Sequence, residues 1–562
     1  MMNITKNKLQ AAKYRIDHPI SLAIAQLIFW LSCIFLLSLG STLLYGLIYL
    51  YPQNGLAILG LAQSPIIIHT VPNMPWTDVA ENILGGFLIA HGQVEYTDFA
   101  TSHFPGIPAL LGFVFKLFNA STAAGGIETL KTTYILAIFS SSLFQLSLIL
   151  IGLLFFTKLS VTTILMVLTT YCLYCLTQHQ FAAPMSETMM VPIVLIATLH
   201  FLNLWSGQLK IDFWQLLLAL EISGLAILIG LTAAPFFMFY CASLVLLFAL
   251  NRFAFLAPAH HDAIPRSTSL DEKFSALIFL GLFVLVCGYV LINIDFSLLY
   301  FWNIPFNVTS LGFKPIQSLL RVFYNLDLAS SFTSKFALFS QPSLLTLFIL
   351  SILCIRLYLD LSHSVKMKSF ILLFLLLMYC SFFWRVSVGY KAYPSLGLVA
   401  GMMIWIISKQ CRIKQSYCPK LWLSTGLFVV TSTILIIYFS SIVHWSPAGK
   451  DDFQRAQFNL CPLNAAADSQ CSCLTPTIYG PQFFLEKDVL NCKGVFPALT
   501  PGFFEYLPLI RDFSERYKTE SIAILYYESI PTPYFPKFFL ELIKQSDCQP
   551  FDAISQVCKY RK

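Results

Sequence analysis

The sequence predicts an α-helical polytopic membrane protein with a small extracytoplasmic α/β domain at its C-terminal end. Of the 562 residues, 57% are hydrophobic and only 11% are charged, which is too apolar for an ordinary soluble protein. Long apolar runs fill the chain up to about residue 443, whereas residues 444–562 are polar and contain no run long enough to span a bilayer. We therefore predict a transmembrane domain, 1–443, and an outer domain, 444–562.

The N-terminal segment is rich in Lys and Arg and precedes an apolar run from about Ser21 to Tyr51. A cleavable signal peptide has a shorter apolar core and a small-residue cleavage site. The segment is therefore interpreted as a cytoplasmic tail followed by a retained first membrane helix.

Further apolar runs of membrane-spanning length follow along the chain, since roughly 20 residues cross a bilayer as a helix. We predict about eleven spans, at approximately 21–50, 129–157, 159–177, 188–205, 213–231, 235–251, 274–294, 343–359, 369–384, 394–408 and 421–443. The weakest connection, Thr232–Pro235, leaves almost no loop and could instead be a kink within one long helix.

The positive charges of the chain support this orientation. Lys158, Lys210, Lys366, Lys368 and Lys409 all fall in connections that the prediction places in the cytoplasm, in agreement with the positive-inside tendency. The formal net charge of +7 therefore indicates membrane orientation. It does not indicate a nucleic-acid partner, because the basic residues form no patch on a soluble domain.

The outer domain is expected to contain a helix near Phe503–Tyr517, a strand at Ser521–Tyr527 and a helix near Tyr534–Gln545, a pattern typical of a small α/β fold. Its six cysteines are expected to form disulfides, because the domain is predicted to lie outside the cytoplasm. Six cysteines allow fifteen connectivities, and we favour a bridge between Cys548 and Cys558 as a plausible local pairing. The competing interpretation is a metal site at Cys471-Ser-Cys473, whose spacing is unusual for zinc.

Ionisable residues are concentrated in the first external loop, 51–128, between Met74 and Leu110. This stretch contains Asp78, Glu81, His91, Glu95, Asp98 and His103. Val79, Ile83, Phe87 and Ala90 recur at helical spacing, which predicts an amphipathic helix along the membrane surface with Asp78 near its N-terminus. A carboxylate there is stabilised by the helix dipole and suits a general base, although Asp78 could equally be a helix N-cap.

With these residues the chain resembles the multi-spanning C-type (GT-C) glycosyltransferase superfamily, which includes protein mannosyltransferases and aminoarabinose lipid A transferases. The resemblance rests on a long first helix, then Asp78, Gly92, Tyr96, Asp98 and Pro105 in the first external loop. It extends loosely to Pro184-Met-Ser-Glu187 and to the basic and aromatic stretch Arg385–Pro394. It implies a GT-C-like fold with the active site in loop 51–128.

The resemblance further implies that Asp78 is the general base, with Asp98 and Glu187 as additional catalytic carboxylates. Displacing a sugar from a polyprenyl phosphate also requires cations on the phosphate leaving group. Arg385 and Lys391 are the first candidates, ahead of Lys314, Arg321 and Lys335, and Tyr96, His103 and Tyr390 are candidate substrate-binding residues. The chain has Asp78-Val79 where many relatives have an acidic pair. We therefore expect no metal cofactor, although Asp98 or Glu187 could complete a metal site in space.

Each of these residues also has a structural interpretation. Glu187 could be a carboxylate at the start of a helix, His91 and His103 could be structural, and Arg385 and Lys391 could anchor the chain at the interface.

The expected function is transfer of a sugar from a polyprenyl-phosphate donor to a lipid, glycan or protein acceptor, on the outer face of a bacterial inner membrane. The alternative is a transporter or flippase for lipid-linked or polar substrates. That class places ionisable residues inside its spans, whereas Glu221 and Asp295 are predicted near span ends or able to snorkel. A third possibility is a non-enzymatic assembly or sensor protein that binds a partner through its outer domain.

Overall fold

The computed structural model of the chain describes the elements that carry its fold, in places as backbone only, as at Asp78. The described residues are 25–44, 67–69, 76–95, 99, 105–119, 126–157, 159–177, 184–209, 211–230, 233–252, 280–281, 283–285, 287–290, 292, 342–361, 364–382, 393–413, 444–446, 458–462, 471–476, 489, 492, 515–527, 537–550 and 555–561.

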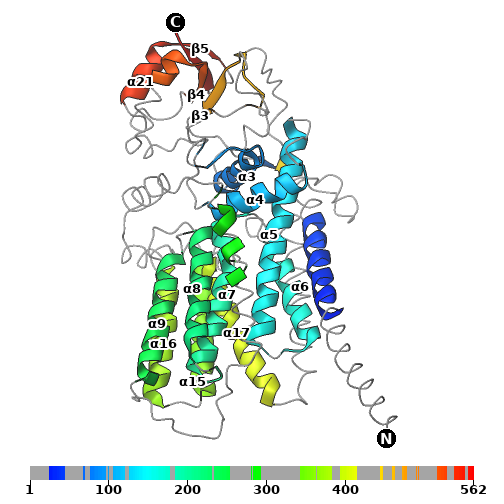
Figure 1. Cartoon of the computed structure of the whole chain (residues 1–562), viewed down its shortest axis with the longest axis vertical. Helices are drawn as coiled ribbons and strands as arrows, with labels where there is room; N and C mark the ends of the chain where they lie inside the picture. Colours follow the sequence, from blue (N-terminus) through cyan, green and yellow to red (C-terminus); the bar gives the residue numbers. More distant parts are fainter. Residues whose placement is uncertain are drawn as a thin grey trace, which may run out of the picture.

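A bundle of long helices forms most of the molecule (Figure 1). After the helix Ala25–Leu44, it contains α5 (Gly126–Phe156), α6 (Val161–Thr177), α7 (Ser186–Trp205), α8 (Phe213–Ile229), α9 (Ala234–Arg252), α15 (Pro342–Asp360), α16 (Val365–Ser381) and α17 (Pro394–Ile413). The chain is a membrane protein, because helices of spanning length and apolar composition are present in this bundle.

The prediction of eleven spans is not confirmed. Among the described residues, three helices are both long and apolar enough to cross a membrane, namely Ala25–Leu44, Thr132–Phe156 and Ser186–Trp205. Several other predicted spans coincide with shorter apolar helices. Both α6 and α8, for example, contain 17 residues, about 25 Å of helix against a hydrocarbon core of about 30 Å. The predicted span 421–443 lies outside the described residues.

Helix α7 is the centre of the bundle, and every one of its residues is buried. Its apolar residues lie on all sides of the helix, which is typical of a helix surrounded by other helices. Two glycines of α17 allow that helix to approach closely. A Cβ atom on Gly397 would lie 2.2 Å from the Val191 carbonyl oxygen, and one on Gly401 would lie 2.8 Å from the Thr198 Cβ. The spacing of these two glycines is the small-xxx-small pattern of close helix pairs.

Polar side chains join the helices at the end of α7 that contains Asn203. The Asn203 Nδ2 donates to the Phe156 carbonyl at the end of α5 over 2.9 Å, and Trp405 Nε1 of α17 donates to Asn203 Oδ1 over 3.1 Å. At the same end, Lys409 of α17 donates to the Asp360 carbonyl at the end of α15. The helix ends that flank several predicted cytoplasmic connections therefore lie together.

Helices α8 and α9 are separate elements, so the alternative of one kinked helix at Thr232–Pro235 is wrong. They pack side by side, and the Ser223 hydroxyl of α8 lies 3.3 Å from the Cys241 sulfur of α9. The chain therefore turns back between them, as the predicted topology requires.

The C-terminal part contains a four-stranded sheet in the order β3-β4-β6-β5. Its strands are β3 (Cys473–Pro476), β4 (Ile522–Tyr527), β5 (Ser546–Pro550) and β6 (Ser555–Tyr560), with the helix α21 (Lys537–Lys544) preceding β5. Strand β3 is parallel to β4, and the other neighbours are antiparallel. The strand predicted at Ser521–Tyr527 and the helix predicted near Tyr534–Gln545 are confirmed. Of the predicted helix 503–517, only its last residues are described, and they are helical.

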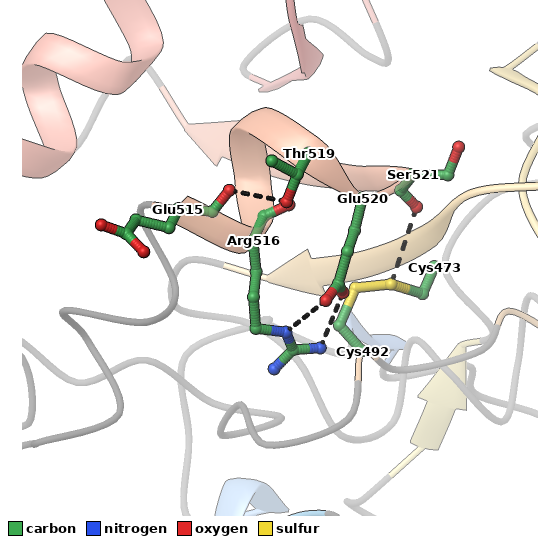
Figure 2. Close-up of polar contacts among 7 residues, drawn as sticks. All are labelled: Cys473, Cys492, Glu515, Arg516, Thr519, Glu520 and Ser521. Carbon is green, nitrogen blue, oxygen red and sulfur yellow. Dashed lines mark hydrogen bonds and ion pairs between the residues drawn. A yellow bond between two sulfur atoms is a disulfide. The ribbon is translucent and has the colours of Figure 1, made fainter.

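Three disulfides hold this part together: Cys461–Cys471, Cys473–Cys492 and Cys548–Cys558. The pairing predicted for Cys548 and Cys558 is confirmed, and the two residues are register partners on β5 and β6. The alternative of a metal site at Cys471-Ser-Cys473 is wrong, because each of these thiols is in a disulfide. Figure 2 shows the Cys473–Cys492 bridge beside the pair formed by Arg516 and Glu520, whose Nε and Oε1 atoms are 2.9 Å apart.

Candidate functional site

Two short helices from the first predicted external loop lie between the bundle and the C-terminal sheet (Figure 1). They are α3 (Trp76–Ala90) and α4 (Gly106–Leu117). They cross closely, because a Cβ atom on Gly86 would lie 2.5 Å from the Leu111 Cβ and one on Gly112 would lie 2.5 Å from the Ile89 Cγ2. Glycine at both positions therefore sets the distance between α3 and α4.

The predicted helix at Asp78 is present, but its described side chains do not form the exposed polar face expected of an amphipathic helix. Residues 81–89 of α3 are all buried, including Glu81 at 3% exposure and Asn82 at 0%. The cause is the packing of α4 and α5 against α3, which covers the side that an interfacial helix would expose to water.

Asp78 lies in the first turn of α3, one turn before Asn82. Its backbone position is therefore at the positive end of the helix dipole, as predicted. Its side chain is outside the described part of the structure, so its role as general base stays a prediction.

A hydrogen bond connects α3 to the start of α7. The Asn82 Nδ2 donates to the Pro184 carbonyl over 2.9 Å, across a sequence separation of 102 residues. The predicted catalytic residue Glu187 is in the first turn of α7, 1% exposed, and its Oε2 accepts a hydrogen bond from the Ser186 hydroxyl over 2.8 Å. The loop of Asp78 and the helix of Glu187, far apart in sequence, thus meet at one end of the bundle.

The stretch Arg385–Pro394 ends at this same end of α7. Tyr393 is 5% exposed and packs against Val191, one turn after Glu187. The start of α4 also contributes, because a Cβ atom on Gly106 would lie 2.4 Å from the Leu228 carbonyl oxygen at the end of α8. The end of α8 in turn reaches the start of α7, because a Cβ atom on Gly230 would lie 2.8 Å from the Ser186 Cβ. Helices α3, α8 and α17 therefore converge around the start of α7, with α4 packed against α3 and α8.

Gly92 ends α3 in a left-handed conformation, with φ of 81°. The Gln93 amide donates back to the Leu88 carbonyl over 3.1 Å, which satisfies a carbonyl of the last helical turn. The contacts of His91 agree with a structural role for this residue. Its Nδ1 lies 2.9 Å from the Phe87 carbonyl oxygen, and its ring packs on the Phe87 ring at 4.3 Å.

Two carboxylates of this region were not selected from the sequence as catalytic candidates. Glu81 and Glu95 are 3% and 0% exposed, and Glu95 forms an isolated bridge with the buried Phe99. The sequence does single out Glu81, because it lies within an otherwise apolar predicted helix, and a buried carboxylate there must be paired or protonated. With Glu187, they make three buried acidic groups on the elements that converge here.

Most of the predicted site residues lie outside the described part of the structure. These are Tyr96, Asp98, His103, Arg385, Tyr390 and Lys391, together with the second-choice cations Lys314, Arg321 and Lys335. Within the described residues, no group of three or more His, Cys, Asp or Glu side chains is arranged to hold a metal ion. A catalytic role for each of the undescribed residues stays a prediction.

A second polar cluster lies inside the bundle, and sequence reasoning missed it. His200 of α7 is 0% exposed. Its Nδ1 lies 2.5 Å from the Tyr240 hydroxyl of α9, and its Nε2 lies 2.7 Å from Gln215 Oε1 of α8. Because both ring nitrogens are engaged, His200 joins three helices as a hydrogen-bonded core residue. The sequence feature that indicates this cluster is a histidine within an apolar run.

The prediction that Glu221 lies near a span end or snorkels to the surface is wrong. Glu221 lies midway along α8 and is 4% exposed. The other predicted intramembrane acid, Asp295, lies outside the described residues.

No protein-family model, curated protein or solved structure matches this chain.

Proposed function

We propose that this chain is a membrane glycosyltransferase that moves a sugar from a polyprenyl-phosphate donor to a lipid, glycan or protein acceptor. The observation that supports this function best is the hydrogen bond from Asn82 to the Pro184 carbonyl. It joins the helix of Asp78 to the helix of Glu187 at one end of an apolar bundle. A lipid-linked donor needs this arrangement, with its polyprenyl chain in the membrane and its sugar phosphate at polar side chains near the surface.

In the proposed reaction the acceptor is a hydroxyl or amine, and Asp78 removes its proton as it attacks the anomeric carbon. The bond between that carbon and the phosphate oxygen breaks, and the polyprenyl phosphate leaves as an anion. Arg385 and Lys391 stabilise the negative charge of the leaving group. The reaction requires no metal ion, and Asp98 and Glu187 act as supporting carboxylates.

The proposed setting is a bacterial inner membrane with the loop 51–128 and the domain 444–562 on the periplasmic side. The parallel pairing of β1 (Ile67–His69) with β2 (His444–Ser446) supports a common side for these two regions. Three disulfides in the C-terminal part support an oxidising compartment. Tyr96, His103 and Tyr390 are proposed to bind the donor or acceptor.

The test is transfer of labelled sugar from polyprenyl-phosphate donors in membranes that contain wild type or Asp78→Asn at matched protein levels. Asn keeps the shape of the side chain and removes the base, so transfer should fall by about 100-fold or more. Glu541→Gln, at an exposed position of α21, is the matched control and should transfer at the wild-type rate. Equal transfer by Asp78→Asn would remove Asp78 from the mechanism.

The second candidate function is a transporter or flippase, and the buried carboxyl of Glu221 midway along α8 favours it. Ionisable groups inside apolar helices commonly mark a substrate or ion pathway. Movement of intact fluorescent polyprenyl-phosphate sugar across vesicles containing the purified chain, without sugar transfer, would support this alternative.

A further inference from the structure

Among the described residues, Glu221 is the buried carboxyl group with two oxygens that lack a hydrogen-bond partner. Ser38, Thr170 and Trp205 also have a buried polar atom without a partner, but they are neutral groups. By contrast, both ring nitrogens of His200 and both polar atoms of the Asn203 side chain are engaged. Buried polar groups are normally hydrogen-bonded, so an exception at this depth requires a physical explanation.

Glu221 lies on a packed face of α8. Helical spacing puts Gly224, Leu225 and Leu228 on the same face. A Cβ atom on Gly224 would lie 2.7 Å from the ring of Phe283, and the Leu228 carbonyl meets Gly106 of α4. The face is therefore covered by the helical segment around Phe283 and by the start of α4.

No described cation offsets an ionised Glu221. The described titratable side chains on α7 and α9 are those of Glu187, His200, Tyr240 and Cys241, and His200 already contacts Tyr240 and Gln215. Helix α9 also carries Arg252 at its last position, with its side chain outside the described part of the structure.

On the other elements that pack against α8, the titratable groups are Lys116 of α4 and the pair Cys287 and Tyr289 near Phe283. Lys116 is exposed and lies in the last turn of α4, far from the contact at Gly106. An ionised carboxylate without a counter-charge is strongly disfavoured in an apolar interior, whereas the neutral acid is tolerated.

We propose that Glu221 is a proton-binding site in the interior of the helical bundle, and that its carboxyl carries a proton at neutral pH. The ligand is the proton itself, and the site is separate from the residues proposed for sugar transfer. The inference rests on the burial, position and missing hydrogen bonds of Glu221, so it holds whether the chain is a transferase or a transporter.

Dicyclohexylcarbodiimide is a suitable probe, because it is apolar, enters membranes and reacts with protonated carboxyl groups. The carboxyl proton moves to one carbodiimide nitrogen, and a carboxyl oxygen bonds to the central carbon to give an O-acylisourea. An acyl shift from oxygen to nitrogen then gives a stable N-acylurea with no leaving group. The product is the sum of the two reactants, so peptide mass spectrometry identifies the labelled residue.

The experiment labels the full chain in native membranes over a pH series. We expect an adduct on Glu221 at neutral pH, with a yield that falls about tenfold for each pH unit once the group ionises. Glu541, exposed on α21, should remain unlabelled, and Glu221→Gln should lose the adduct. No adduct on Glu221, or a yield that stays constant from acidic to alkaline pH, would overturn the proposal.

Thermal unfolding gives an independent readout. If the folded chain holds this proton more tightly than the unfolded chain does, the stability it contributes is lost as pH rises through the folded-state titration. The wild type should therefore lose Tm with rising pH relative to Glu221→Gln, which mimics the neutral acid. Parallel Tm profiles would contradict the proposal, and so would a Glu221→Gln variant that fails to fold while Glu221→Asp folds.

Discussion

The helical bundle and the C-terminal sheet are stabilised in different ways. In the bundle, the cysteines whose side chains are described are free thiols: Cys33, Cys172, Cys241, Cys287, Cys354 and Cys380. In the C-terminal part, by contrast, three disulfides connect the described cysteines. The bundle depends on close helix approach and buried hydrogen bonds, whereas a small sheet buries too little apolar surface and gains stability from covalent bonds. Cysteine pairing thus distinguishes the two parts.

The largest expected effect comes from removing the Cys473–Cys492 bridge, whose cysteines are 19 residues apart. Replacing both with Ser should destabilise the C-terminal part by about 3 kcal/mol, because the unfolded segment gains conformational freedom. The exposed Arg516–Glu520 pair beside the bridge (Figure 2) offsets little of this loss, since exposed ion pairs contribute roughly 0–1 kcal/mol. Limited proteolysis during urea unfolding measures the change.

The matched control for this prediction is Cys380→Ser, because Cys380 is a free thiol in α16. It should leave the protease resistance of residues 458–561 unchanged. Equal loss of resistance in the two variants would mean that the bundle and the sheet unfold as one unit, contrary to the comparison.

The second effect concerns the bundle. Gly397→Ala places a Cβ atom 2.2 Å from the Val191 carbonyl oxygen, so α17 must move away from α7 at a cost of about 2–3 kcal/mol. Thermal unfolding in detergent should show the loss. Gly40→Ala is the control, because a Cβ atom there meets nothing within 4 Å. A Gly397→Ala variant as stable as Gly40→Ala would refute close packing of α7 and α17.

The smallest effect concerns a side-chain contact of the C-terminal part. The Tyr517 hydroxyl lies 2.7 Å from the Ser546 hydroxyl oxygen and donates to the Cys558 carbonyl over 3.1 Å, and burial raises the pKa of Tyr517 to about 12. Tyr517→Phe should cost about 1 kcal/mol, much less than loss of a disulfide. Urea unfolding of this variant beside Lys518→Ala, at an exposed neighbour, measures the difference. A cost as large as that of the disulfide would show that covalent bonds do not dominate here.

Tyr517 also gives a pH dependence. Because its folded-state pKa is raised above its ordinary value of 10.0 to about 12, the stability it contributes is present below about pH 10 and is lost as pH rises toward 12. The wild type should lose this increment over that range, and Tyr517→Phe should not.

The sequence predicted those features that depend on local composition. Apolar runs predicted the positions of α5, α7, α8, α9 and α17, and six outer cysteines predicted disulfides, including Cys548–Cys558. The predicted number of spans was wrong, because the length of an apolar run does not show how many of its residues form a helix. In α8, for example, 17 residues do so.

The predictions that were wrong or incomplete concern contacts between residues that are distant in sequence. Periodicity predicted the helix at Asp78, yet it could not show that α4 and α5 cover the polar positions Glu81 and Asn82. The link from Asn82 to Pro184 spans 102 residues, a distance at which no local pattern is informative. The central position of Glu221 already followed from the predicted span 213–231, whereas its burial depends on the helices that pack against α8.

The most direct test of the proposed transferase uses a donor that is labelled separately on its sugar and on its polyprenyl phosphate, incubated with the purified chain in vesicles that contain acceptor. A transferase breaks the bond between the two labels, so the sugar label should appear on the acceptor, with one polyprenyl phosphate released for each sugar transferred. Recovery of both labels on one intact donor molecule, moved from one leaflet to the other, would contradict the transferase and establish the flippase.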